Sequence, residues 1–367
     1  MKIGTTTKLI PQNIAPKNAK KLAIYNGDEK VCDIQLGHLA MPHVGEKLYS
    51  VGVLSDAHVT TSTTTNDSQT DFPRALEYLQ GQSDFICVCG DGVDSGTTEN
   101  FELYNGFIGE NVYSITGNHE FYTDGDPRKH EEAAMQSLMR TYARVPLRYT
   151  ISSNPTSELE ADGVISEGGN IYNAAIGGND VFIMLGISSD WSTFGADGLQ
   201  WLHATLDANR HKRCFLFEHI RPDDASGNGE NLKWSDLWAE TNTYAMVFTK
   251  LLKHYKNVYF FHGHSHFTLD MQTRENMANL DEVYGRYSIH VPSATYPRGI
   301  PVTSADEENG FSTLIGESQG YLMDVYADFV VLKGVDLVTG SAIPIAQYLL
   351  DTKIQEIESK AYSYFSS

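Results

Sequence analysis

The sequence predicts an α/β protein in which mixed β-sheets are covered by helices. Short apolar runs recur along the chain, each ends in polar residues, and helical stretches lie between several of them. Continuous apolar runs of this length are typical of strands that are buried on both faces. The predicted strands of this kind span residues 50–54, 85–89, 112–116, 181–186, 214–217 and 258–261.

Helical periodicity is clearest in three stretches, residues 131–143, 198–208 and 234–255. In the second of them, Leu199, Leu202 and Leu206 fall on one helix face. After about residue 287 the pattern changes to strands alone, and these are expected at residues 287–291, 320–325 and 329–332. The first 47 residues differ from the rest. They predict a β-hairpin of residues 22–25 and 31–36, joined at an Asn26-Gly27 turn.

The charge of the chain restricts its partners. There are 27 Lys and Arg residues against 47 Asp and Glu residues, so the formal net charge is −20. An acidic surface repels a phosphate backbone, so we expect no broad nucleic-acid-binding face. A small phosphate ester is compatible with this charge if bound cations dominate the local field.

Neither a signal peptide nor a long apolar segment is visible in the sequence, so we expect a soluble, cytoplasmic protein without a membrane contact. The four cysteines are too few for a disulfide framework. Cys87 and Cys89 point to the same side of a predicted strand and are expected to be buried apolar residues.

Residues able to bind metals cluster directly after five of the predicted strands. In an open α/β sheet, ligands bind in the crevice beyond the carboxyl ends of the strands. Carboxylates and imidazoles suit divalent Mn, Fe and Zn, and an asparagine adds a neutral oxygen. A single cluster of this kind is usually structural, but five at strand ends indicate a metal site. The clusters are Asp56-Ala-His58, Gly90-Asp91-Gly-Val-Asp94, Gly117-Asn118-His119-Glu120, His219 and Gly263-His264-Ser-His266.

This series of motifs resembles the calcineurin-like metallophosphoesterase superfamily, in its phosphodiesterase-like branch, over residues 48–266. The resemblance implies a four-layer α/β/β/α sandwich of two mixed sheets flanked by helices. It also implies a dinuclear centre that hydrolyses phosphodiesters or phosphomonoesters by attack of a hydroxide shared between two divalent ions. The ligands it implies are Asp56, His58 and His266 for one metal and Asn118, His219 and His264 for the other, with Asp91 bridging them.

The same resemblance suggests two catalytic residues that are not metal ligands. His119 would protonate the leaving alkoxide, and Asp94 would orient His119. An alternative role for Asp94 is to cap the helix that follows it.

Departures from the superfamily pattern narrow the substrate. Ser95 and Gly96 follow Asp94 where phosphoprotein phosphatases have an arginine that grips phosphate, so a protein phosphatase is disfavoured. The tyrosine ligand of purple acid phosphatases is also missing. A small phosphate ester is therefore the expected substrate. Glu218 before His219 is a further departure, and it would tune His219 or bind solvent.

We expect three regions: an N-terminal extension over residues 1–47, the catalytic domain over 48–335, and a C-terminal extension over 336–367 that packs on the core. Tyr122, Trp191, Arg221 and Arg298 are candidate pocket residues, and residues 152–170 are a candidate lid. Two alternatives remain open at this point. One is a nuclease of the same superfamily, which the charge disfavours. The other is a structural or accessory component of a larger assembly, which the complete ligand set disfavours.

Overall fold

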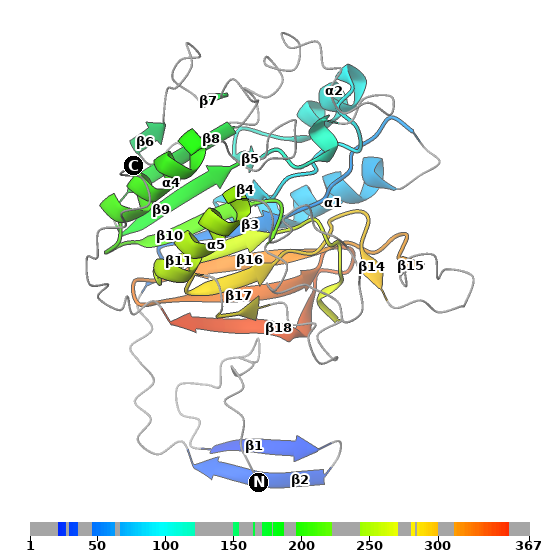
Figure 1. Cartoon of the computed structure of the whole chain (residues 1–367). Helices are drawn as coiled ribbons and strands as arrows, with labels where there is room; N and C mark the ends of the chain where they lie inside the picture. Colours follow the sequence, from blue (N-terminus) through cyan, green and yellow to red (C-terminus); the bar gives the residue numbers. More distant parts are fainter. Residues whose placement is uncertain are drawn as a thin grey trace.

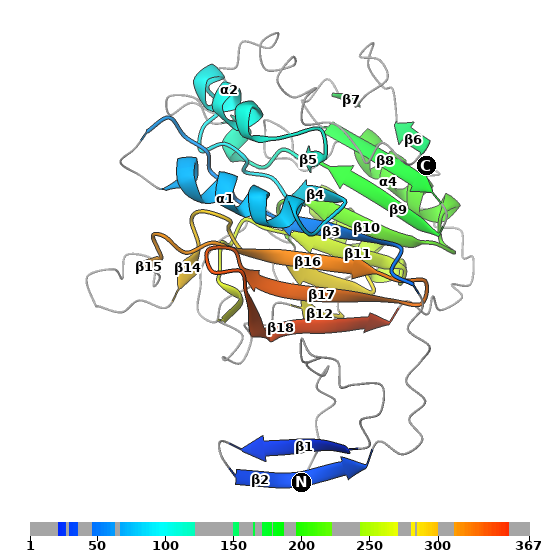
Figure 2. The same ribbon diagram turned by 180° about the vertical axis from the view of Figure 1, so that it is seen from behind.

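A computed structural model describes the chain in segments. The described residues are 21–26, 29–35, 46–62, 67–121, 150–153, 164–165, 171–177, 179–186, 196–221, 243–270, 280–282, 285–299 and 312–351. Two β-sheets form the body of the molecule, and helices lie on the outer side of each (Figures 1 and 2).

The first sheet has six strands in the order β18-β17-β16-β3-β4-β5. Strands β3, β4 and β5 pair in parallel, and the other pairs are antiparallel. The parallel strands coincide with the first three predicted apolar runs. The strands are β3 (Tyr49–Leu54), β4 (Phe85–Val88), β5 (Val112–Ser114), β16 (Gln319–Val325), β17 (Phe329–Asp336) and β18 (Ser341–Asp351).

The second sheet has eight strands, of which β9, β10, β11 and β13 pair in parallel at its centre. The path runs β12-β13-β11-β10-β9-β8-β6, and β7 pairs with β8. The strands are β6 (Thr150–Ser153), β7 (Val164–Ile165), β8 (Ile171–Gly177), β9 (Asp180–Leu185), β10 (Arg213–Glu218), β11 (Val258–His262), β12 (Leu280–Asp281) and β13 (Tyr287–His290). A separate small ribbon joins β14 (Arg298–Gly299) to β15 (Ser312–Thr313).

Alternate residues of the buried strands serve two apolar layers. Between the sheets, Phe182 of β9 packs against Phe85 of β4 with ring centroids 5.3 Å apart. The opposite faces of the same strands, such as Ile86 and Ile183, pack against helices. This arrangement confirms the predicted four-layer sandwich. The helices are α1 (Ser68–Gln80), α2 (Thr98–Phe107), α4 (Ala196–Ala208) and α5 (Thr243–His254).

Helix α4 matches the predicted helix over 198–208, and α5 is the described part of the one predicted over 234–255. The helix predicted over 131–143 lies outside the described residues. The candidate lid over 152–170 contains β7, which pairs with the sheet, and most of the remainder is not described. Cys87 and Cys89 are buried on the same side, between the sheets, as predicted.

The N-terminal hairpin consists of β1 (Lys21–Asn26) and β2 (Glu29–Gln35), paired antiparallel as a sheet of their own. At the other end, β18 lies in the region predicted as a C-terminal extension and pairs with β17. The proposed division into three regions stays a prediction. Within the described part of the chain, no helix is both long and apolar enough to cross a bilayer.

A buried polar clamp joins the two sheets where β3, β9 and β10 begin. Asp180 of β9 accepts a hydrogen bond from the Tyr49 hydroxyl of β3 at 2.6 Å and forms a two-point ion pair with Arg213 of β10. Arg213 also donates to the carbonyl of Tyr326, beyond β16. Burial would lower the pKa of Arg213, but Asp180 outweighs it and raises the pKa.

Replacing Asp180 by alanine should destabilise the protein by about 3–5 kcal/mol, because it leaves a buried guanidinium without its carboxylate. Tyr49→Phe removes one hydrogen bond of the same clamp and should cost only about 1 kcal/mol. Urea unfolding at pH 7 measures both values. A loss below 1 kcal/mol for Asp180→Ala would show that the clamp does not hold the sheets together.

Candidate metal centre

The loops that follow five parallel strands meet at one edge of the sandwich. Strands β3, β4 and β5 of the first sheet lead to Asp56 and His58, to Asp91, and to Asn118. Strands β10 and β11 of the second sheet lead to His219, and to His264 and His266. All seven side chains are buried, with at most 7% of each residue exposed. The structure therefore brings every predicted ligand residue into one cluster, drawn from both sheets.

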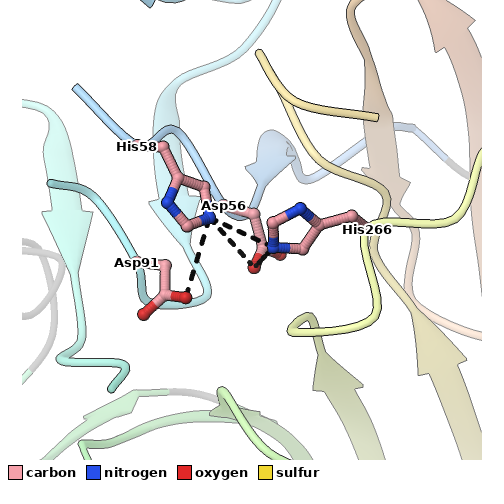
Figure 3. Close-up of side chains that lie close together, drawn as sticks. All are labelled: Asp56, His58, Asp91 and His266. Atoms are coloured by element: carbon pink, nitrogen blue, oxygen red, sulfur yellow. Dashed lines mark hydrogen bonds and ion pairs between the residues drawn. The ribbon is translucent and has the colours of Figure 1, made fainter. Parts of the chain in front are cut away.

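One group of ligand atoms surrounds Asp56 (Figure 3). His266 Nε2 lies 3.0 Å from Asp56 Oδ1 and 3.1 Å from His58 Nε2. His58 Nε2 is in turn 3.7 Å from Asp91 Oδ2. Ligands bound at roughly 2.1 Å to one ion are separated by about 3 Å, so these spacings are close to those of a coordination sphere.

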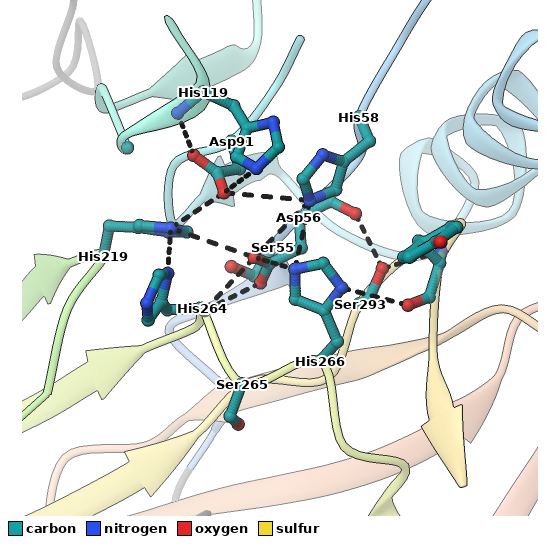
Figure 4. Close-up of polar contacts among 12 residues, drawn as sticks. Ser55, Asp56, His58, Asp91, His119, His219, His264, Ser265, His266 and Ser293 are labelled. Carbon is teal, nitrogen blue, oxygen red and sulfur yellow. Dashed lines mark hydrogen bonds and ion pairs between the residues drawn. The ribbon is translucent and has the colours of Figure 1, made fainter. Parts of the chain in front are cut away.

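A second group lies on the other side of Asp91 (Figure 4). His219 Nε2 is 3.0 Å from Asp91 Oδ2, 3.1 Å from Asn118 Oδ1 and 3.3 Å from His264 Nδ1. Asp91 Oδ2 thus faces an imidazole of each group. This oxygen is buried and has no hydrogen bond of good geometry, which suits a carboxylate that bridges two cations.

Oxygen acceptors behind two of the histidines set their orientation. His219 Nδ1 donates to the Cys89 carbonyl at 2.7 Å, and His266 Nδ1 donates to the Tyr296 carbonyl at 3.1 Å. A carbonyl only accepts, so Nδ1 carries a proton and Nε2 is directed at the cluster. Backbone and carboxylate partners of this kind are the usual support of metal-ligating histidines.

The buried carboxylates of the cluster need positive charge close to them. Burial would raise the pKa of Asp56, but His266 and His219 outweigh it and lower that pKa. Burial would likewise lower the pKa of His219, yet Asp91 and Asp56 raise it to about 10. In the metal-free protein the His219 proton therefore compensates the two carboxylates. A divalent ion would take over this role and release the proton, so the donor set fits the metal centre that the motifs indicate.

The backbone at the cluster is strained in a consistent way. Within the described residues, every non-glycine residue with a positive φ is a predicted ligand, with φ between 43° and 70°. Left-handed backbone at non-glycine residues is uncommon and concentrates at functional sites. The residues are Asp56, His58, Asp91, His264 and His266.

Glycines before three of the predicted ligands make room for other predicted ligands. A Cβ at Gly90 would lie 2.8 Å from the His219 ring. One at Gly117 would collide with the Asp91 carboxylate, and one at Gly263 with Asp56. The glycines of the GD, GN and GH pairs are therefore explained by packing around the ligand atoms.

Gly117→Ala should weaken metal binding at least ~10-fold, because the methyl group displaces the Asp91 carboxylate without changing any ligand. Gly106→Ala is the matched control, since its Cβ on α2 meets nothing within 4 Å. It should leave metal affinity unchanged. Equilibrium binding of Mn²⁺ to both variants is the measurement, and equal affinities would refute the packing argument.

His119 and Asp94 lie at the exposed side of the cluster. The His119 ring packs edge-on against His58 with centroids 4.4 Å apart, and its Nε2 lies 4.0 Å from Asp91 Oδ2. Its Nδ1 donates to the backbone carbonyl of Asp94 at 2.6 Å. The Asp94 carboxylate is closer to His58 Nδ1, at 3.5 Å, than to His119 Nδ1, at 4.0 Å. Asp94 thus contacts His119 through its backbone. The N-cap of α2 is Thr97, not Asp94.

Glu120 has a structural role that the motif reading did not assign. Its buried carboxylate accepts from the amides of Gly92 and Gly117 at 2.6 Å each, and from those of Asp91 and Val93 at 3.2 and 3.3 Å. Burial and the nearby Asp91 raise the pKa of Glu120 to about 7. It ties the loop after β4 to the loop after β5. In the sequence, the only indication of this role was the place of Glu120 directly after His119.

Of the candidate pocket residues, Tyr122 and Trp191 lie outside the described residues. Arg221 is buried and 2% exposed, so it belongs to the interior. The amide of Arg298 donates to the His266 carbonyl at 2.8 Å, which places β14 beside the last ligand loop.

Glu218 is fully buried beside His219. Its carboxylate oxygens make no hydrogen bond of good geometry. The nearby amides of Ile220 and His219 lower the pKa of Glu218 and so offset part of the increase that burial causes. Burial raises the pKa of Glu218 well above its usual value. The neutral acid is thus the form that the fold favours.

The burial of Glu218 predicts that the protein becomes less stable as pH rises. The folded-state pKa exceeds the unfolded one, so the contribution of Glu218 to stability is complete below about pH 4.5 and is lost as pH rises. Glu218→Gln does not titrate, so its melting temperature relative to wild type should increase from pH 5 to pH 8 in the metal-free protein. Glu77→Gln, on an exposed position of α1, is the control. A gap that stays constant with pH would contradict the assignment.

The sequence matches the calcineurin-like phosphoesterase family over residues 49–267, more than half of the chain. The chain belongs to this family. No curated protein matches the sequence.

Three solved structures are similar to parts of the fold. A conserved uncharacterised protein of Streptococcus pneumoniae, a predicted phosphoesterase, is 10% identical, with 83% of this chain and 97% of that chain covered and a TM-score of 0.34. GAP50, the anchor in the inner membrane complex of Plasmodium, is 12% identical, with 85% and 91% covered and a TM-score of 0.45. Vacuolar protein sorting 29 of Cryptosporidium parvum is 14% identical, with 82% and 97% covered and a TM-score of 0.34. All three TM-scores are below 0.5, so family membership rests on the sequence match.

Proposed function

We propose that this protein hydrolyses phosphoric ester bonds with two divalent metal ions, Mn, Fe or Zn, bound at the cluster. Asp56, His58 and His266 would hold one ion and Asn118, His219 and His264 the other, with Asp91 between them. The observation that carries the proposal is the buried Asp91 Oδ2, which faces an imidazole of each group at 3.7 and 3.0 Å. When bound, the two ions supply a hydroxide at neutral pH and a clamp for the phosphoryl oxygens.

The residues of the chain carry out the remaining steps. The buried carboxylates and imidazoles would hold the two ions in a site with little water, where electrostatic stabilisation of the transition state is strongest. His119 stands at the exposed side and delivers a proton to the leaving oxygen. The Asp94 carbonyl fixes the His119 Nδ1 proton, so Nε2 is the atom that exchanges a proton with the substrate.

The substrate we propose is a small phosphodiester or phosphomonoester. A net charge of −20 opposes binding of a nucleic acid along the surface, whereas a small ester meets mainly the cations of the site. Ser95 in place of the phosphate-gripping arginine argues against phosphoproteins. The complete set of seven buried ligand residues supports an enzyme over a purely structural component.

Hydrolysis of bis-p-nitrophenyl phosphate and p-nitrophenyl phosphate, after separate loading with Mn, Fe or Zn, tests this function. We expect turnover by the wild type and its loss in Asp91→Asn, which keeps the shape of the side chain but removes the charge. His119→Ala should reduce kcat by about 10²–10⁴-fold on an alkyl ester, a poor leaving group, and much less on the nitrophenyl esters.

Tyr49→Phe serves as a control, because it removes one hydrogen bond at the opposite end of β3 and should keep full activity. If folded, metal-loaded wild type turns over none of these esters, the proposed hydrolase function is refuted. An equal loss on good and poor leaving groups would refute the acid role of His119.

A further inference from the structure

A segment outside the family match lies directly against the first ligand loop. Residues 293–296 follow β13, whereas the family match ends at residue 267. Ser293 pairs with Ser55 in an isolated parallel bridge, and the Ala294 amide donates to the Ser55 carbonyl at 2.9 Å. The segment therefore lies alongside the end of β3, where the loop that contains Asp56 begins.

Two hydroxyl groups of this segment hold the carbonyls of that loop. Ser293 Oγ donates to the Asp56 carbonyl at 2.7 Å, and Thr295 Oγ1 donates to the Ala57 carbonyl at 2.5 Å (Figure 4 shows Ser293 beside Asp56). Asp56 and His58 have φ values of 51° and 43°, so the loop leaves the extended conformation in which amides of a neighbouring strand would donate to its carbonyls. The hydroxyls satisfy these carbonyls and stabilise the left-handed turn.

The segment is itself held rigidly. Ser293 Oγ accepts from the Tyr296 amide at 2.7 Å, and Ser318 Oγ donates to the Ala294 carbonyl at 2.5 Å. Ser293, Thr295 and Ser318 are all buried, with at most 2% exposed.

The same segment reaches a second ligand loop. The Tyr296 carbonyl accepts the Nδ1 proton of His266 at 3.1 Å, and the Tyr296 ring packs near His266 and His58, at 5.7 and 5.9 Å between centroids. Its contacts thus reach Asp56, His58 and His266. Among the described interactions, none links residues 293–296 to Asn118, His219 or His264.

We propose that residues 293–296 are the positioning segment of one metal site, the one formed by Asp56, His58 and His266. Ser293 and Thr295 set the backbone of the Asp56 loop, and the Tyr296 carbonyl sets the ring of His266. Loss of these contacts weakens that site while the site of Asn118, His219 and His264 keeps its ion. This inference rests on the dinuclear centre of the proposed function.

The test is Mn²⁺ binding to full-length Thr295→Val and Ser293→Ala, measured by equilibrium dialysis with elemental analysis and by electron paramagnetic resonance. Valine has nearly the shape of threonine but cannot donate to Ala57. Wild type should hold two Mn²⁺ per chain with the spectrum of a coupled pair. Each variant should hold one tightly and the second about 10–100-fold more weakly, with the spectrum of an isolated ion.

Two further variants separate positioning from general stability. Thr295→Ser keeps the hydroxyl and should restore both ions. Ser50→Ala removes another buried hydroxyl, bonded to Asp324 at the start of β3, and should also retain both. Melting of the metal-free proteins should be similar throughout.

Three results would overturn the inference: Thr295→Val and Ser293→Ala bind both ions as tightly as wild type, they lose both ions equally or unfold, or Thr295→Ser behaves like Thr295→Val. A wild type that binds fewer than two Mn²⁺ would refute the dinuclear centre itself, and the inference with it. Two ions in wild type without ester hydrolysis would refute only the proposed reaction.

Discussion

The site depends on a single constraint, the position of one buried carboxylate between two sets of imidazoles. Asp91 follows β4, the middle parallel strand of the first sheet, so its neighbours on both sides come from loops of β3 and β5. The amide of His58 donates to the Asp91 carbonyl at 2.9 Å, and the amide of His119 donates to the Asp91 carboxylate at 2.9 Å. His219 approaches from the second sheet, so the carboxylate also marks where the two sheets meet.

The residues around the Asp91 carboxylate have unusual backbone conformations or crowded glycines. Five predicted ligand residues adopt left-handed φ values, and glycines stand where a side chain would strike Asp56, Asp91 or His219. The Glu120 carboxylate accepts from four amides of two loops. Such conformations cost roughly 1–3 kcal/mol each and persist only where the surroundings over-determine them. The apolar layers of the sandwich and the Asp180–Arg213 clamp at the other end supply that rigid frame.

The central strands and the ligand clusters could be predicted from the sequence because both follow from local patterns. A strand buried on two faces must be apolar throughout, and the ligand residues stand at its end. Helices α1 and α2 were not predicted. Helix α1 buries Phe72, Ala75, Leu76 and Leu79 on one face, but Pro73 lies inside it, and a proline within a stretch argues against a helix. Helix α2 buries only Asn100, Phe101 and Tyr104, so its apolar stripe is weak. Pro344 similarly obscures β18, an edge strand.

Within the site, the features that could not be predicted from the sequence are those that depend on tertiary contacts. Ser293 and Thr295 belong to a short polar stretch without any metal-ligand spacing, and only the pairing of Ser293 with Ser55 reveals their partners. The contact of Asp94 with His119 through its carbonyl was equally invisible, because a motif specifies side chains and not backbone acceptors.

The crowded glycines have a consequence for how relatives of this chain evolve. A single methyl group at position 117 or 263 strikes the carboxylate of Asp91 or Asp56 while every ligand residue remains in place. A single mutation can therefore disturb the cluster while all seven predicted ligand residues remain in the sequence. When relatives are classified as having an intact or a disrupted site, Gly117 and Gly263 are as informative as the histidines.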